Sequence, residues 1–128
     1  MRVNYFGLHL ILDAYGASYK QLAEKKLIKD FLNNLPELIG MKKLAQAQVF
    51  EYDGGGNKED WGYSGFVVIT TSHISIHTYP KKGYFAADVF SCSFFDYKKI
   101  LSQFKKTFKF KTYEHQVIKR GLKFKRNV

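Results

Sequence analysis

Residues 64–92 read SGFVVITTSHISIHTYPKKGYFAADVFSC, and this stretch decides the fold. It holds three runs rich in β-branched and aromatic residues, a composition typical of β-strands. The connections between the runs are short, and the one from Pro80 to Gly83 has the residues of a tight turn. The stretch therefore predicts an antiparallel block of three strands.

The N-terminal part of the chain adds one strand, one helix and a further strand. Apolar residues alternate with others from Val3 to Leu12, which predicts a half-buried strand. Ser18 and Gln21 resemble a capping box, and the apolar residues after them recur at helical spacing as far as Pro36. This pattern predicts a helix that ends at the proline, followed by a strand over about residues 44–52.

The C-terminal part predicts a second helix and a last strand. Asp96 is an expected N-cap for an amphipathic helix that runs to Phe108, and a strand is expected over about residues 111–118. The order of elements is then β, α, three or four β, α, β. This order predicts the α+β class, as a two-layer sandwich in which an antiparallel sheet carries helices on one face. We expect one domain over residues 1–128.

Composition limits the class of protein. The chain has 128 residues and 45% hydrophobic content, which suits a single packed core. No apolar run approaches the roughly 20 residues of a membrane span, and the N-terminus lacks a small-residue cleavage site. We therefore expect a soluble, cytoplasmic protein with no membrane partner. Cys92 is the single cysteine, so it has no partner for an internal disulfide.

The net charge of +10 is placed at one end of the chain. Residues 1–96 hold ten basic and ten acidic side chains, whereas residues 97–128 hold eleven basic ones and Glu114 as the one acid. A segment such as FKKTFKFK, at residues 104–111, suits phosphate neutralisation and base stacking. A basic nucleic-acid-binding module is thus one alternative. No nucleic-acid motif accompanies the segment, so a solvated helix face and a basic tail are favoured.

Three other kinds of site are disfavoured by the sequence. His73 and His77 lie on a predicted strand, about 13 Å apart along it, so they cannot bind one metal ion and we expect no metal site. The run GYSG at residues 62–65 lacks the flanking pattern of a hydrolase nucleophile. The loop DGGGNKED at residues 53–60 lacks the following helix that a phosphate cradle needs.

Residues 64–92 resemble the short bacterial and archaeal S-adenosylmethionine decarboxylases, which are self-cleaving and pyruvoyl-dependent. The resemblance includes GLHLILDAYGAS at residues 7–18 and EHQVIKRG at residues 114–121, so it covers nearly the whole chain. It implies a proenzyme that acts on a small-molecule substrate in polyamine synthesis, and a homodimer of cleaved chains. Some members of the family decarboxylate arginine or ornithine, and these remain alternative substrates.

The resemblance also implies roles for individual residues. The hydroxyl of Ser72 attacks the carbonyl of Thr71, and the bond between them is cleaved to leave a pyruvoyl cofactor made from Ser72. That ketone forms a Schiff base with the substrate amine and accepts electrons when the carboxylate is lost. His77 corresponds to the processing histidine and Ser64 to a hydroxyl residue that assists it. Cys92 corresponds to the thiol that protonates the substrate carbon.

The resemblance carries two further expectations about substrate binding, and the sequence departs from the family at two positions. His9 and Asp13 match the opening motif and share a strand face, where they border or orient the site. Tyr79 stands where the family often has an aromatic residue that stacks on a purine. Lys81 replaces a glutamate that binds the ribose hydroxyls, and lysine has no acceptor for them. Thr71 also replaces the glutamate that usually precedes the cleaved serine.

Overall fold

Residues 64–92, the stretch quoted above, contribute three neighbouring strands to the middle of the sheet. The computed structural model describes residues 4–125, and in it β3 (Gly62–Ile69), β4 (Ser72–Tyr79) and β5 (Tyr84–Ser91) pair in antiparallel order. Thr70 and Thr71 connect β3 to β4, and the short 3₁₀ helix η2 (Pro80–Lys82) leads into β5. The predicted three-strand block is confirmed.

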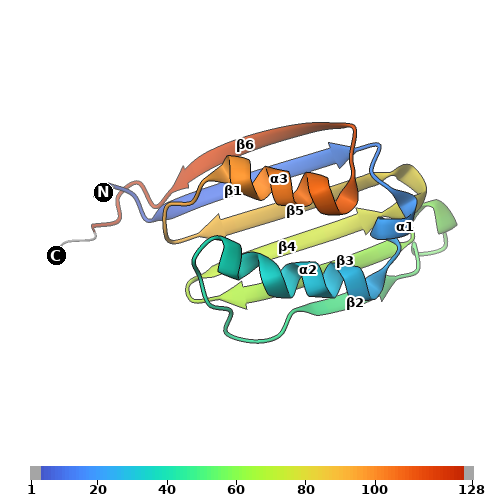
Figure 1. The fold of residues 1–128 in the computed structure, drawn as a ribbon, viewed down its shortest axis with the longest axis horizontal. Helices are drawn as coiled ribbons and strands as arrows, with labels where there is room; N and C mark the ends of the chain where they lie inside the picture. The colour runs from blue at the N-terminus through green and yellow to red at the C-terminus, as the bar shows by residue number, and fades with distance from the viewer. Residues whose placement is uncertain (1–3, 126–128) are drawn as a thin grey trace.

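The remaining strands extend this block on both sides. β1 (Gly7–Tyr15) lies between β5 and β6 (Thr112–Arg120), and β2 (Gln48–Tyr52) pairs with β3 at the other edge. The order across the sheet is β2-β3-β4-β5-β1-β6, with every neighbouring pair antiparallel. β1 and β6, the first and last strands along the chain, lie side by side in the sheet (Figure 1).

Two helices cover one face of the sheet. α2 (Lys25–Leu38) lies over β3 and β4, and α3 (Tyr97–Phe108) lies over β1 and β5 (Figure 1). Alternate residues of the strands turn toward these helices and form the core, because successive side chains of a strand point to opposite faces. The fully buried large side chains of this core include Leu10, Leu12, Ile28, Leu32, Ile74, Ile76, Phe85, Phe104 and Phe108. The predicted two-layer α+β sandwich is confirmed.

Five details of the elements differ from expectation. The first predicted helix is two helices, since α1 (Tyr19–Leu22) ends before α2 begins. Ser18 bonds the side chain of Gln21 rather than a backbone N–H of the helix, so no capping box forms. Pro36 lies inside α2, two residues before its end, where the missing N–H removes one helical bond and does not stop the helix.

The fourth difference concerns the strand expected over residues 44–52, which begins only at Gln48. Residues 42–47 instead pass along β3, where the Leu44 N–H donates to the carbonyl of Val68. The glycine-rich loop ends in a 3₁₀ turn, η1 (Lys58–Asp60). The fifth difference is the first strand, expected from Val3 to Leu12, which runs from Gly7 to Tyr15; Val3 itself lies outside the described residues. Within residues 4–125, no helix is both long and apolar enough to cross a membrane.

Candidate active site

The connection between β3 and β4 holds the predicted cleavage site. Ile69 pairs with Ser72, so Thr70 and Thr71 form a two-residue turn. Thr71 has φ +53°, in the left-handed region. That conformation costs an L-residue about 1–2 kcal/mol, and β-branched residues adopt it rarely. The carbonyl expected to be attacked therefore belongs to a strained, exposed residue.

Ser72 and Cys92 meet at this end of the sheet. Ser72 is 4% exposed, and its Oγ accepts a hydrogen bond of 2.9 Å from the Cys92 backbone N–H. The Cys92 Sγ lies 3.7 Å from the carbonyl oxygen of Thr70. Cys92 is placed there because it directly follows β5, which pairs with β4. The fold thus brings the predicted pyruvoyl precursor beside the predicted proton donor.

Ser64 and His77 form a second pair across β3 and β4. The two residues are register partners, and the Ser64 Oγ lies 2.7 Å from His77 Nδ1. Both side chains lie on the sheet face that the helices leave uncovered, which we call the open face. The hydroxyl and the imidazole are close enough to exchange a proton.

These two pairs do not meet within one chain. Ser72 and His77 are five residues apart on one strand, which corresponds to about 17 Å at 3.3 Å per residue. An odd separation also puts their side chains on opposite faces of the sheet: Ser72 is buried on the helix side, and His77 is exposed on the open face. Within one chain His77 therefore cannot act on Ser72.

His9 and Asp13 lie on the open face, as expected from their alternation on β1. His9 Nε2 lies 2.9 Å from a carboxylate oxygen of Asp88, and Asp13 accepts a 2.6 Å bond from the Tyr84 hydroxyl. Partial burial and the bond to Asp13 raise the pKa of Tyr84 well above its ordinary value. The sequence interpretation missed Arg120, whose Nη1 lies 3.4 Å from His9 Nδ1, because no local pattern shows that β6 pairs with β1.

Tyr79 and Lys81 lie at the opposite end of β4 from Ser72. Tyr79 is the last residue of the strand, and its ring contacts that of Tyr84 at 5.6 Å between centroids. Lys81 is exposed in η2, next to Lys82, whose ammonium forms a 2.7 Å ion pair with Asp60. In one chain these two residues thus lie at the end of β4 that carries His77, away from the Thr71–Ser72 bond.

His73 and His115 have no assigned role in the chemistry, and each packs against an aromatic ring. His73 follows Ser72 and lies against the Phe90 ring, at 5.5 Å between centroids. Burial lowers the pKa of His73 below its ordinary value. His115 stacks on Tyr97 at 5.4 Å, far along the chain from the cleavage site. Neither contact links these histidines to Ser72.

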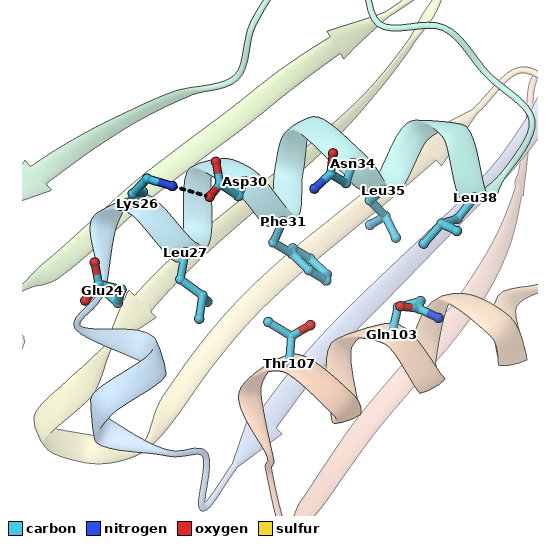
Figure 2. A pocket seen from close by; sticks show the side chains of 10 residues that line it. All are labelled: Glu24, Lys26, Leu27, Asp30, Phe31, Asn34, Leu35, Leu38, Gln103 and Thr107. Atoms are coloured by element: carbon cyan, nitrogen blue, oxygen red, sulfur yellow. Dashed lines mark hydrogen bonds and ion pairs between the residues drawn. The ribbon is translucent and has the colours of Figure 1, made fainter.

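A cavity between the two long helices lies away from all of these groups. It has a volume of about 470 Å³ and opens between α2 and α3. Figure 2 shows that Leu27, Phe31, Leu35 and Leu38 point from α2 into it, with Thr107 and Gln103 on the side of α3. Its lining lacks a nucleophile paired with a base, so we do not assign the chemistry to it.

Comparisons with known proteins place the chain in one family. Residues 8–121 match the family model of S-adenosylmethionine decarboxylase. The S-adenosylmethionine decarboxylase proenzyme of Clostridium botulinum strain Langeland is 35% identical over 120 residues, covering 93% of this chain and 97% of the relative. The proenzyme of Archaeoglobus fulgidus is 29% identical over 118 residues, covering 90% and 97%.

The fold has a solved counterpart. The crystal structure of the adenosylmethionine decarboxylase from Aquifex aeolicus superposes with a TM-score of 0.79, covers 98% of both chains and is 22% identical. That likeness shows a shared architecture, and the sequence matches show common descent. The chain therefore belongs to the S-adenosylmethionine decarboxylase family.

Proposed function

We propose that this protein is made as a proenzyme, cleaves its own Thr71–Ser72 bond, and decarboxylates S-adenosylmethionine with a pyruvoyl group derived from Ser72. In the cell it would supply an aminopropyl donor for polyamine synthesis in the cytoplasm. The observation that carries the proposal is the cluster at the β3–β4 turn. A strained Thr71 precedes a buried Ser72, whose Oγ is held by the Cys92 N–H.

The geometry suits the first step of cleavage. Ser72 Oγ attacks the Thr71 carbonyl carbon, the C–N bond breaks as the C–O bond forms, and the freed amine takes up the hydroxyl proton. The Cys92 N–H donates to Oγ and so holds the hydroxyl in a fixed position beside the turn. The left-handed conformation of Thr71 raises the energy of the intact peptide, so its strain lowers the barrier to this rearrangement.

The second step needs a base. Loss of the Ser72 α-proton expels the Thr71 carboxylate and leaves a dehydroalanine, which water converts to the pyruvoyl group with release of ammonia. An imidazole titrates near neutrality and suits this proton transfer. His77 of the same chain is about 17 Å away along β4, too far to reach the Ser72 α-proton, so we assign the role to His77 of a second copy.

The open face suits a second copy. It exposes Phe50, Phe66 and Val68 by 55%, 39% and 42%, and Phe50 is the register partner of Ser64. An exposed apolar patch of this kind marks an interface. A two-fold axis that runs above the open face, parallel to the sheet and across the strands, brings the Ser64–His77 end of one copy over the Ser72 end of the other. Each of the two sites then draws residues from both chains.

After cleavage, the pyruvoyl group would supply the electron sink for loss of the substrate carboxylate. Ser72 becomes the new N-terminus, and the Cys92 thiol remains beside it to deliver a proton to the substrate α-carbon. The thiol lies just past the end of β5, and Cys92 is only partly buried.

Cys92→Ala tests that role. We expect the variant to cleave like the wild type, because the bond to Ser72 comes from the Cys92 backbone N–H, which alanine keeps. Turnover should fall by about 100-fold or more, since general acid catalysis contributes about 10²–10⁴ in rate. Ser93→Ala, at the exposed neighbouring position, is the control and should retain full turnover. Normal turnover of Cys92→Ala would show that another group protonates the product.

The substrate is tested by release of labelled CO₂ from S-adenosylmethionine, arginine and ornithine. Two carboxylates that could bind a basic amino acid are already engaged, Asp60 by Lys82 and Asp88 by His9. We therefore expect S-adenosylmethionine to react fastest, despite Lys81. The uncleaved Ser72→Ala protein gives the background. Release from arginine or ornithine alone would replace the proposed substrate with a basic amino acid while keeping the pyruvoyl chemistry.

A further inference from the structure

A shallow groove between α3 and β6 lies apart from both halves of the proposed active site. Its volume is about 420 Å³. The residues that line it are Tyr97, Lys98, Leu101, Ser102, Lys105, Phe110, Tyr113 and His115. It opens on the helix-covered side of the sheet, so pairing of two copies through the open face leaves it accessible.

Aromatic rings form one wall of the groove. His115 stacks on Tyr97, with centroids 5.4 Å apart and ring planes at 25°, and Tyr113 lies 5.6 Å from His115. All of β6 is exposed, because α3 lies over β1 and β5 and leaves this edge strand uncovered. Tyr113 is 47% exposed. These rings therefore offer π-faces to a ligand instead of filling the core.

Positive charge borders the same rings. Lys98 and Lys105 line the groove and are seven residues apart on α3, which is about 10 Å along the helix axis. The Lys105 ammonium donates to the Phe110 carbonyl and lies 4.9 Å from the centre of the Phe110 ring, which fixes its charge at the groove. In the described part of the chain, no lysine or arginine after residue 97 forms an ion pair. Glu114, the one acid of this segment, alternates with Tyr113 and His115 and accepts a bond from Tyr15 on the open face.

We infer that this groove binds single-stranded nucleic acid. Bases stack on Tyr113 and His115, while Lys98 and Lys105 neutralise phosphates and other lysines of α3 continue the basic track. Aromatic platforms combined with basic grooves are how proteins bind single strands without sequence preference. A duplex keeps its bases stacked on each other, and a flat membrane surface cannot enter a groove between a helix and a strand, so both fit the groove less well.

The experiment is an anisotropy titration of the full-length protein against a fluorescein-labelled 12-nucleotide oligo(dT), at 50 and 200 mM salt. We expect binding that weakens with salt. Tyr113→Ala should lower affinity at least about fivefold, since one base stacked on an aromatic ring contributes about 1–3 kcal/mol. Tyr113→Phe, which keeps the ring, should bind like the wild type. Tyr52→Ala is the matched control, because Tyr52 is an edge-strand tyrosine of similar exposure, 50%.

Charge is tested in the same way. Lys98→Ala should reduce the slope of log affinity against log salt by about 0.7, the value for one phosphate contact on a single strand. Lys25→Ala, at the start of α2, should leave the slope unchanged. Absence of binding at 50 mM salt, equal loss in Tyr113→Ala and Tyr52→Ala, or equal competition by duplex or phosphatidylserine vesicles would overturn the inference. The assay needs no cleavage or decarboxylation, so it is independent of the proposed function.

Discussion

Ser72→Ala should leave the protein as one uncut chain of full length, with no detectable decarboxylation. Alanine has no hydroxyl to attack the Thr71 carbonyl, so neither the ester nor the pyruvoyl group can form. The fold should persist, because the change removes one hydrogen bond, the one from the Cys92 N–H to Ser72 Oγ, and leaves the apolar core intact. Intact mass spectrometry and circular dichroism measure the two outcomes.

The control for this variant is Ser93→Ala, which removes an exposed serine hydroxyl close to Cys92. It should be cleaved as completely as the wild type. Cleavage of the Ser72→Ala chain at the same position would exclude Ser72 as the nucleophile. Cleavage at a different bond would move the site away from the β3–β4 turn.

Co-expression of two inactive chains should restore cleavage in one of them. His77→Ala alone should not be cleaved, or should be cleaved far more slowly, because the base is missing from both sites of its dimer. When it is paired with Ser72→Ala, the site that contains Ser72 of the first chain receives His77 from the second chain. The His77→Ala chain should then be cleaved while the Ser72→Ala chain stays intact.

The matched control replaces the Ser72→Ala chain with the double variant Ser72→Ala/His77→Ala, which brings no imidazole to the mixed dimer. Different affinity tags allow the mixed dimers to be purified, and mass spectrometry assigns the cut to one chain. An uncut His77→Ala chain in purified mixed dimers with Ser72→Ala would refute the shared site. Normal cleavage of His77→Ala alone would remove His77 from the mechanism.

Local patterns in the sequence were sufficient to predict the central strands. Alternation, β-branched residues and turn residues predicted β3, β4 and β5 with short connections between them, whereas the two-residue turn before Ser72 was not predicted. Once the two-residue turn at Thr70 and Thr71 is known, the register makes Ser64 the partner of His77. The same register shows that His77 and Ser72 face opposite sides, a consequence that the sequence interpretation did not draw when it placed both in one site.

Other features depend on contacts between distant parts of the chain. The break between α1 and α2 has no glycine or proline to mark it. The Thr78 hydroxyl donates to the Leu22 carbonyl at the end of α1, a contact across 56 residues that no pattern predicts. The bond from Cys92 to Ser72 likewise depends on the pairing of β4 with β5. Local periodicity gives the elements, whereas these contacts arise only when the sheet forms.

The most direct test of the central claim is the intact mass of the purified wild-type protein under denaturing conditions. We predict two fragments, residues 1–71 and residues 72–128, with the second carrying a pyruvoyl group and therefore no free N-terminal amine. A hydride reagent should shift the mass of that second fragment alone, because it reduces the ketone. A single uncut chain that persists under native conditions and releases no CO₂ from S-adenosylmethionine would contradict the account.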